Sequence, residues 1–376
     1  MQHRTTEPPI RVAIDVTPLL GARTGIGRLV AGLVEGLEAR TDVEVARFAM
    51  TARARRLAAP KQRFPLPARA ARAVWERIDW PTIEPWAGRV DVVHGTNYVV
   101  PPSRVARLVS VHDLTAIRFP EMCTPDVRRV PVLLKRSLRR GAHVHTDSHF
   151  VADEVHTELG VERARIHTVA PGVPISHESL ATARRHPHPF DGRPFALALG
   201  TVEPRKDLPM LVAAFAETAS LLPDLTLVIA GADGWGSEAL RAAIAQVPST
   251  IRARIIRETN VDDDRRSTLL VHASFVVYPS LYEGFGFPPL EAMAARTPVI
   301  ATSAGSLPEV LGDGAEFVDV GDIAALSDAM IRLASDGPRR SELVESGQRR
   351  VDHYQWPITA EKFVALYRDL ADGARA

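Results

Sequence analysis

The sequence predicts an α/β protein with two Rossmann-like, doubly wound domains facing a cleft. Short apolar runs rich in β-branched residues alternate with amphipathic stretches along almost the whole chain, which is typical of parallel strands joined by crossover helices. This alternation stops once, at 174–194, and then restarts. The length of 376 residues also corresponds to about two domains. Sheets of this kind bind ligands beyond the carboxyl ends of their strands.

Each element is expected where the apolar pattern has the matching period. In the first half, strands are expected at 11–17, 43–49, 90–94, 107–112, 143–147 and 165–170, and helices at 26–39, 125–140 and 150–159. In the second half, strands are expected at 195–200, 225–231, 253–257, 275–279, 298–302 and 316–320. The helices there are expected at 207–222, 237–246, 263–272, 289–296, 307–311 and 323–335. The tail, 338–372, has a helical pattern in which Trp356-Pro357 marks a kink or a helix start.

These elements predict a division into domains. The first domain is expected at 1–175, and a linker at 176–194, where prolines are frequent and no periodic apolar face is present. The second domain is expected at 195–356, and a last helix at about 357–376 is expected to pack back on the first domain.

Composition excludes several classes of protein. With 46 basic and 45 acidic residues the net charge is +1, so no overall attraction to nucleic acid exists and no such partner is expected. A single cysteine, Cys123, excludes an intrachain disulfide and a cysteine zinc site. No apolar run approaches the roughly 20 residues that span a bilayer, and the first residues lack a secretory signal. We therefore expect a cytoplasmic protein.

The segment 275–296 carries the most chemical information. An apolar strand is followed by a glycine loop and by a helix that Pro288-Pro289 opens, an arrangement that presents backbone N–H groups and a positive dipole end to an anion. Because the prolines lack N–H groups, phosphate contacts are expected from Gly286, Phe287, Leu290 or Glu291.

Two glutamates bracket this loop. Glu283 precedes the turn, and Glu291 is expected in the first helical turn, where the helix dipole keeps it ionised. Both carboxylates are predicted to face the cleft as acceptors for ligand hydroxyls. An ordinary glycine turn with an acidic residue at the helix start is the alternative.

The segment 195–212 repeats the layout of strand, glycine and helix. Gly200 ends the strand, and Arg205 and Lys206 stand before a helix that begins near Asp207. Two cations at this position can neutralise a diphosphate by charge-assisted hydrogen bonds. Solvated loop charges are the alternative interpretation.

In the first half, Gly21, Gly25 and Gly27 lie between a strand and a helix, where glycine lets the backbone approach a ligand. Their spacing does not match the dinucleotide fingerprint. His112-Asp113 ends another strand. His112 is interpreted as a hydrogen-bond donor, a general base or a loop residue without a chemical role.

Together these positions resemble the retaining glycosyltransferases of family 4, which have the GT-B fold, over essentially the whole chain. The resemblance is carried by E-x(7)-E at 283–291 and EPRK at 203–206, supported by the TGIG loop, VHDL at 111–114 and SLPEVLGD at 306–313. The variants GTVEPRKDL and EGFGFPPLEAM look most like mannosyltransferase-type members.

The resemblance implies a hexosyltransferase with an acceptor-binding first domain and a donor-binding second domain. It would move a hexose, mannose favoured, from a nucleotide-diphosphate sugar to a glycan or lipid-linked acceptor in cell-envelope or polysaccharide synthesis, with retention of configuration. The favoured donor is GDP-mannose, and a UDP-sugar is the alternative. No metal, other cofactor or enzyme nucleophile is implied.

The resemblance also implies residue roles. Lys206 and Arg205 would grip the diphosphate, Glu283 would orient the sugar hydroxyls, and Glu291 would hold the ribose. His112 would lie near the transferred sugar as a catalytic residue. The other donor-binding positions would be Gly25, Gly27, Gly200, Thr201, Val261, Gly284, Phe285, Gly286, Phe287 and Leu290.

The chain departs from the family pattern at two places. Thr201 follows Gly200 where some relatives have arginine, so the second diphosphate cation falls to Arg205. The segment 171–174 reads Pro-Gly-Val-Pro where Asn-Gly-Val-Asp is common, so contacts of that asparagine and aspartate lack a counterpart.

The segment 51–80 predicts a second kind of contact. It holds eight basic and two acidic residues, with Trp75 and Trp80 among them. Such a stretch can bind anionic lipid head groups, which would place the protein on the inner face of the plasma membrane. A solvated arginine-rich surface is the alternative.

Two apparent metal sites have simpler interpretations. Asp262, Asp263 and Asp264 contain a D-x-D spacing, but helix capping with acids in the first turn is favoured. The histidines at 143, 145 and 149 are explained equally well by strand alternation before a helix start. Two other functions stay open: a GT-B-like sugar-nucleotide epimerase, and a non-catalytic sugar-nucleotide-binding protein.

Overall fold

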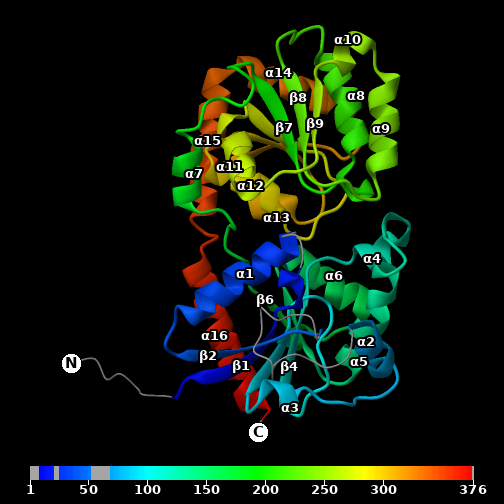
Figure 1. Cartoon of the computed structure of the whole chain (residues 1–376), viewed down its shortest axis with the longest axis vertical. Coiled ribbons are helices and arrows are strands. Elements are labelled where there is room, and N and C mark those ends of the chain that lie inside the picture. The colour runs from blue at the N-terminus through cyan, green and yellow to red at the C-terminus, as the bar shows by residue number, and fades with distance from the viewer. Residues whose placement is uncertain (1–7, 21–24, 52–67, 375–376) are drawn as a thin grey trace, which may run out of the picture. The chain divides into compact units, whose positions relative to one another are not determined.

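The computed structural model describes residues 8–20, 25–51 and 68–374. The chain forms two compact units (Figure 1). Unit 1 contains the described residues up to Gly172 and from Tyr354 onward, and unit 2 contains Val173–His353. Each unit is built on a six-stranded sheet.

The sheet of unit 1 has the order β2-β1-β3-β4-β5-β6, and its strands pair in parallel. Its strands are β1 (Ile10–Asp15), β2 (Val43–Phe48), β3 (Val92–Gly95), β4 (Ala106–Val111), β5 (His143–Thr146) and β6 (Ile166–Thr168). All six strands were predicted, with small shifts at their ends. The chain reverses its direction of growth between β1 and β3, which is where such sheets bind ligands.

Helices cover both faces of this sheet. The predicted ones are α1 (Gly25–Glu38), α5 (Val130–Arg139) and α6 (His149–Leu159). Helix α2 (Ala68–Trp75) lies in the basic segment 51–80, part of which was expected to be helical. The helices α3 (Glu84–Ala87) and α4 (Thr115–Arg118) were not predicted, because four residues are too few to show a periodic apolar face. Helix α16 (Trp356–Gly373) contacts α1 and β1 (Figure 1). It begins at Trp356 with Pro357 in its first turn, so this dipeptide is a helix start.

A buried chain of hydrogen bonds ties α16 to the sheet. The Tyr367 hydroxyl lies 2.8 Å from His94 Nδ1, and His94 Nε2 lies 2.8 Å from Ser110 Oγ. Ser110 Oγ lies 2.9 Å from His145 Nδ1, and His145 Nε2 lies 2.9 Å from the Val169 carbonyl. Because a carbonyl only accepts, His145 Nε2 must carry a proton. Burial lowers the pKa of His94 and of His145, which favours neutral rings, and with neutral rings each bond along the chain has one direction, from Tyr367 to Val169. His145 is therefore a neutral structural residue, as strand alternation suggests.

The sheet of unit 2 has the order β12-β11-β10-β7-β8-β9 and also pairs in parallel. Its strands are β7 (Phe195–Leu199), β8 (Thr226–Ala230), β9 (Ile255–Glu258), β10 (Phe275–Tyr278), β11 (Val299–Thr302) and β12 (Ala315–Val318). All six were predicted. Here the reversal lies between β7 and β10, so the loops after these neighbouring strands meet at one edge of the sheet.

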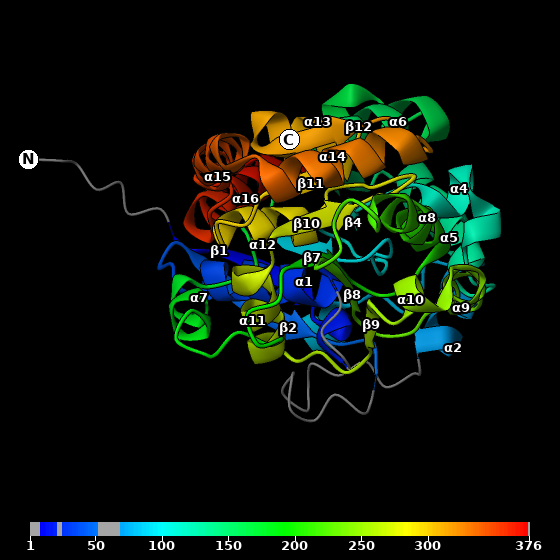
Figure 2. The same ribbon diagram turned by 90° about the horizontal axis from the view of Figure 1, so that it is seen from above.

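The helices of unit 2 follow the prediction closely. They are α8 (Leu208–Thr218), α9 (Ser237–Gln246), α10 (Ser249–Arg252), α11 (Asp263–His272), α12 (Phe287–Ala294), α13 (Leu307–Leu311), α14 (Ile323–Ser335) and α15 (Gly337–Val351). The short α10 was not predicted. Helix α8 contacts both α9 and α14 (Figures 1 and 2), and these helices share an apolar core with the sheet.

One prediction about the segment between the halves is wrong. The stretch expected as a linker, 176–194, contains a helix, α7 (His177–Ala183), that packs on α11 of unit 2. Leu180 and Ala183 on α7 are buried. Ser176 caps the helix by accepting a hydrogen bond from the Ser179 backbone. The sequence pattern missed α7 because two apolar contacts in seven residues produce no recognisable period.

Candidate active site

The two loops with the clearest chemistry follow β7 and β10, the neighbouring strands at the switch point of unit 2. The β7 loop contains a 3-10 turn, Pro204–Lys206, and the β10 loop leads into α12. The backbone N–H of Leu281 donates to the Arg205 carbonyl at 2.7 Å, which joins the loops directly. The EPRK block and the E-x(7)-E segment therefore belong to one site.

Lys206 is a buried cation in this site. Its side chain lies over Gly200, where a Cβ atom would be 2.2 Å from Nζ, and only 8% of the residue is exposed. Gly200 has φ +136°, a conformation that glycine adopts without strain. Burial lowers the pKa of Lys206, and the charge of Arg205 lowers this pKa further. No hydrogen bond or ion pair holds the ammonium within the part of the chain that the structure describes.

Arg205 contacts carboxylates. Its Nη1 lies 2.5 Å from Glu283 Oε1, and its Nε lies 2.8 Å from Glu203 Oε2. The guanidinium also donates to the Tyr282 carbonyl at 3.4 Å. Of the two cations predicted to grip a diphosphate, Arg205 is thus engaged by acidic groups in this structure, and Lys206 is not.

Glu283 is held from three sides. The Tyr278 hydroxyl donates to Oε1 at 2.7 Å and the Ser280 hydroxyl at 3.1 Å, in addition to the Arg205 contact. Burial by itself raises the pKa of Glu283, but the charges of Arg205 and Lys206 outweigh it and lower this pKa below its usual value. Glu283 is therefore an ionised carboxylate in a fixed orientation.

Helix α12 begins where the glycine loop predicts. Gly286 has φ +101° and precedes the first helical residue, Phe287. A Cβ on Gly286 would lie 2.6 Å from Leu307 Cδ2 on α13, so this position requires glycine. Phe285 is buried with its ring 5.2 Å from that of Phe287, and Leu290 is buried in the helix.

Glu291 lies deeper than expected. It is the fifth residue of α12 rather than part of the first turn, and it is fully buried. An ion pair with Arg266 of α11, and not the helix dipole, balances its charge. The prediction of a first-turn position is wrong because α12 begins at Phe287, before the two prolines. Arg266 was missed, since its position in an Asp-Arg run gave no sign of this partner.

Two other predicted donor-binding residues follow strands of the same sheet. Thr201 comes directly after Gly200 and is half-buried. Val261 follows β9, which is separated from β7 by β8. The structure thus places Val261 beyond the same edge of the sheet, but two strands away from the Lys206 loop.

In unit 1, His112 follows β4 and is buried. Its Nδ1 lies 2.7 Å from Asp147 Oδ2, and its Nε2 lies 2.9 Å from the Thr96 carbonyl. Burial alone lowers the pKa of His112, but the Asp147 carboxylate and the hydrogen bonds outweigh it and raise this pKa. Both ring nitrogens face acceptors, an arrangement that favours the doubly protonated imidazolium and engages both nitrogens, so neither is available as a general base in this structure.

The segment between β1 and α1 carries the predicted glycine loop, and β1 ends in a residue that the sequence analysis did not single out. Residues 21–24 are outside the described residues, but Gly25 and Gly27 belong to the first turn of α1, where Gly27 is buried. Asp15, the last residue of β1, accepts hydrogen bonds from the backbone and side chain of Thr17. Burial raises the pKa of Asp15 to about 6.

The aspartate run before α11 is a helix cap. Asp262 accepts a hydrogen bond from the Arg265 backbone at 2.7 Å, and Asp263 and Asp264 form the first turn. The prediction of helix capping is confirmed.

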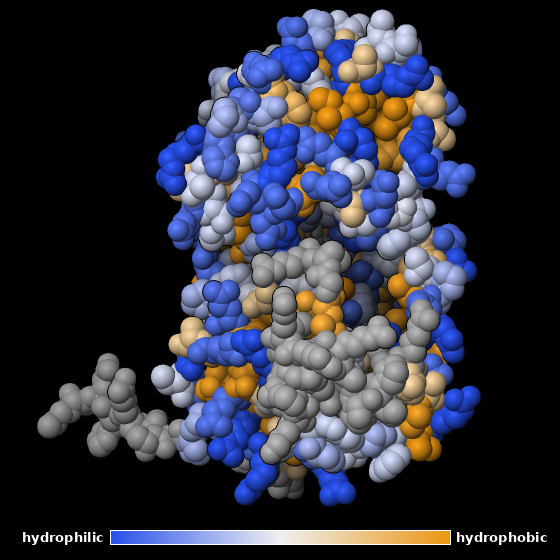
Figure 3. Space-filling view, in the orientation of Figure 1, coloured by the Kyte–Doolittle hydropathy of each residue, from blue (hydrophilic) through white to orange (hydrophobic). Residues whose placement is uncertain are grey.

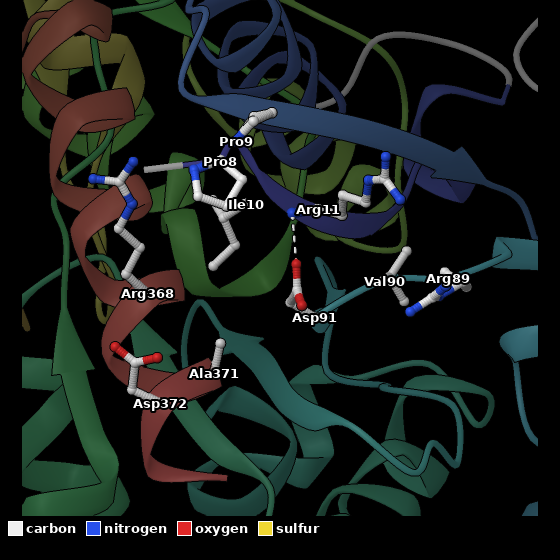
Figure 4. A pocket seen from close by; sticks show the side chains of 10 residues that line it. All are labelled: Pro8, Pro9, Ile10, Arg11, Arg89, Val90, Asp91, Arg368, Ala371 and Asp372. Atoms are coloured by element: carbon white, nitrogen blue, oxygen red, sulfur yellow. Dashed lines mark hydrogen bonds between the residues drawn. The ribbon is translucent and has the colours of Figure 1, made fainter. Parts of the chain in front are cut away.

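A cavity of about 540 Å³ lies at the opposite end of the sheet of unit 1 (Figure 4). It is lined by residues at the start of β1, before β3 and near the end of α16, including Arg11, Asp91 and Arg368. Asp91 accepts a hydrogen bond from the Arg11 backbone at 3.0 Å. None of the predicted site residues lines this cavity.

Comparison with known proteins agrees with this geometry. The family "Glycosyl transferases group 1" matches residues 181–350, and "Glycosyl transferase 4-like domain" matches residues 24–172. The chain is 29% identical over 289 residues to O-antigen chain mannosyltransferase B of Escherichia coli, covering 74% of each chain. It is 31% identical over 172 residues to phosphatidyl-myo-inositol mannosyltransferase of Mycobacterium leprae, covering 45% of this chain and 44% of the relative.

Among solved structures, sucrose-phosphate synthase from Thermosynechococcus elongatus matches with a TM-score of 0.74 at 20% identity. The match covers 97% of this chain and all of that one, and it shows the two-domain GT-B fold. The two family matches together cover most of the chain and show that it belongs to the glycosyltransferases with this fold, where it resembles the mannosyltransferase type.

Proposed function

We propose that the protein is a retaining mannosyltransferase that uses a nucleotide-diphosphate sugar, with GDP-mannose favoured over a UDP-sugar. The observation that carries this proposal is the buried ammonium of Lys206 beside the fixed carboxylate of Glu283. A buried cation without a partner is costly. A donor diphosphate would supply the missing anion, and Glu283 would accept hydrogen bonds from the sugar that the diphosphate carries.

The remaining roles follow from this placement. Backbone groups from Gly284 to Phe287 would contact the sugar, with the start of α12 adding its positive dipole end. Glu291 would hold the ribose. Departure of the diphosphate would be stabilised electrostatically by Lys206 and by the helix start, without a metal ion. The leaving phosphate oxygen would take the acceptor proton from the same face of the sugar, which retains the configuration.

The acceptor is proposed to be a glycan or a lipid-linked molecule of the cell envelope. The mannosyltransferase relatives named above, one for an O-antigen chain and one for phosphatidyl-myo-inositol, support this choice.

We propose a cytoplasmic location on the inner face of the plasma membrane. Within the described residues, no helix is both long and apolar enough to cross a bilayer. The face seen in Figure 3 shows hydrophilic residues with separate apolar patches.

Part of the segment proposed to contact a membrane, 52–67, lies outside the described residues. In the remainder, Trp75 is buried, whereas Ile78 and Trp80 are 50% and 67% exposed. Asp79 forms ion pairs with Arg136 and Arg140, which tie the loop to α5 and its end. Apolar side chains beside basic ones suit an anionic lipid surface.

Two experiments test the proposal. Incubation with radiolabelled GDP-mannose, UDP-glucose and other sugar nucleotides should give transfer or hydrolysis from one donor. An isomerised donor would instead indicate an epimerase, and binding without any turnover a binding protein.

In liposome sedimentation at low salt, anionic vesicles should bind the wild type more than Trp80→Ser. Equal or absent binding would contradict the membrane surface.

A further inference from the structure

We propose that Arg266 is a positioning residue of the donor site. It would hold Glu291 so that one carboxylate oxygen can accept a hydrogen bond from a ribose hydroxyl of the nucleotide. This inference rests on the proposed function. Arg266 belongs neither to the EPRK block nor to the E-x(7)-E segment. It lies on α11, and its guanidinium Nη2 contacts Glu291 Oε2 on α12.

The surroundings of Glu291 make this contact necessary. Its side chain is fully buried, and that of Arg266 is only 13% exposed. An ionised carboxylate at such a depth is strongly unfavourable unless a cation balances it. Among the described residues, Arg266 on α11 pairs with this carboxylate, so the orientation of Glu291 depends on a neighbouring helix.

The second carboxylate oxygen of Glu291 indicates what kind of ligand group would bind there. Glu291 Oε1 is buried and has no hydrogen-bond partner in the described part of the chain. A buried acceptor of this kind is usually satisfied by some donor. Because Arg266 already balances the charge of Glu291, the remaining oxygen favours a neutral donor such as a hydroxyl over a cation. A ribose hydroxyl of the nucleotide has this chemistry.

Arg266 also lies close to the proposed diphosphate site. Its positive charge is one of the causes that lower the pKa of Lys206, although burial is the largest. The Arg266–Glu291 pair and Lys206 therefore lie within electrostatic range of each other in unit 2. A nucleoside diphosphate can then reach Lys206 with its phosphates and Glu291 with its ribose.

The same helix supplies a matched control. Arg265 precedes Arg266 and also pairs with a glutamate, Glu258, with Nη2 2.5 Å from Oε1. This neighbouring pair is more exposed, and Glu258 lies at the end of β9 rather than on α12. Arg265→Gln thus removes an arginine–glutamate pair from α11 without touching Glu291.

The test is discrimination between nucleotides with and without ribose hydroxyls. Calorimetry on the full chain would compare UDP, GDP and ADP with their 2′-deoxy and 3′-deoxy forms. A site that binds a hydroxyl rejects the analogue that lacks it, so the wild type should favour the ribonucleotide by about tenfold or more. Arg266→Gln should bring this ratio close to one, whereas Arg265→Gln should preserve it.

Other outcomes are equally decisive. A folded Arg266→Gln variant that still prefers the ribonucleotide as strongly as the wild type would overturn the role of Arg266. So would a wild type that binds the ribonucleotide and its deoxy forms equally. Either result would leave the proposed function intact. Should Arg266→Gln not fold, the double variant Arg266→Met/Glu291→Gln removes both charges together. It should bind the diphosphate without discrimination, and retained discrimination would overturn the proposal. A wild type that binds no nucleoside diphosphate would refute the proposed function itself.

Discussion

The amino group of Lys206 occupies the space that a side chain on Gly200 would need, with Nζ 2.2 Å from the position of a Cβ atom. The position of Lys206, in the 3-10 turn, therefore depends on a glycine at position 200. The lysine side chain can lie at the switch point between β7 and β10 because Gly200, which follows β7, has no side chain to occupy that space.

We expect Gly200→Ala to weaken nucleoside diphosphate binding by about tenfold, because the added methyl group displaces Nζ. Because Gly200 has a positive φ, the alanine should also lower the free energy of unfolding by about 1–2 kcal/mol. Gly321→Ala is the matched control, since Gly321 has φ +83° but no atom within 4 Å of its Cβ position. Calorimetry should show weak binding for the first variant only. Equal affinities would contradict the displacement of Lys206.

The lowered pKa of Lys206 predicts a dependence on pH. In the ligand-free protein, burial favours the neutral amine, whereas a diphosphate favours the ammonium. The affinity for a nucleoside diphosphate should therefore fall as the pH rises through the lowered pKa toward 10.5, the ordinary value of a lysine. Over the same window the ligand-free fold gains stability, because the unfolded chain still holds the proton.

Lys206→Arg is the control, because arginine keeps its charge at these pH values. Its affinity should be nearly constant where that of the wild type falls, and Lys206→Ala should lose at least about tenfold in activity. An identical pH profile for Lys206→Arg and the wild type would show that another group titrates.

We expect Glu283→Gln to lower kcat by about a hundredfold while nucleoside diphosphate affinity changes less than about threefold. The carboxylate is fixed by Tyr278, Ser280 and Arg205, and its proposed partner is the sugar rather than the nucleotide. Steady-state kinetics and calorimetry separate the two quantities. A loss confined to affinity would argue for a nucleotide-binding role.

Asp147→Asn should lower the pKa of His112 and so favour the neutral imidazole near pH 7, because the Asp147 carboxylate is the largest of the causes that raise this pKa. A raised histidine pKa contributes stability below the unfolded value of about 6.5, and this is lost as the pH rises through the folded value. The variant should therefore be destabilised more at pH 6 than at pH 9, as measured by urea denaturation.

Nitrogen NMR of His112 checks this directly. At neutral pH both ring nitrogens should be protonated in the wild type and in the control Asp153→Asn, which removes an exposed ion pair with Arg163. One deprotonated nitrogen in the wild type would contradict the assignment.

Asp262→Ala should lower the free energy of unfolding by about 1 kcal/mol through loss of the α11 cap. Activity should stay near that of the wild type, and EDTA should not change it. Asp264→Ala, which removes a first-turn acid without removing the cap, should destabilise less. Activity that Asp262→Ala abolishes and that added Mn²⁺ restores would indicate a metal site.

By itself, the sequence determined the twelve strands of residues 8–20, 25–51 and 68–374, most of the longer helices there and the two loops that carry the proposed donor chemistry. The apolar periods that predict strands and helices are patterns among residues close in sequence. The carboxyl ends of parallel strands share one edge of the sheet, so the positions of the two loops also followed from the order of the strands. Only the tertiary structure decided which charges meet. Arg266 and Glu291 are 25 residues apart and His112 and Asp147 are 35 apart. Their pairing depends on how whole helices and strands pack, and burial then decides whether each group is charged.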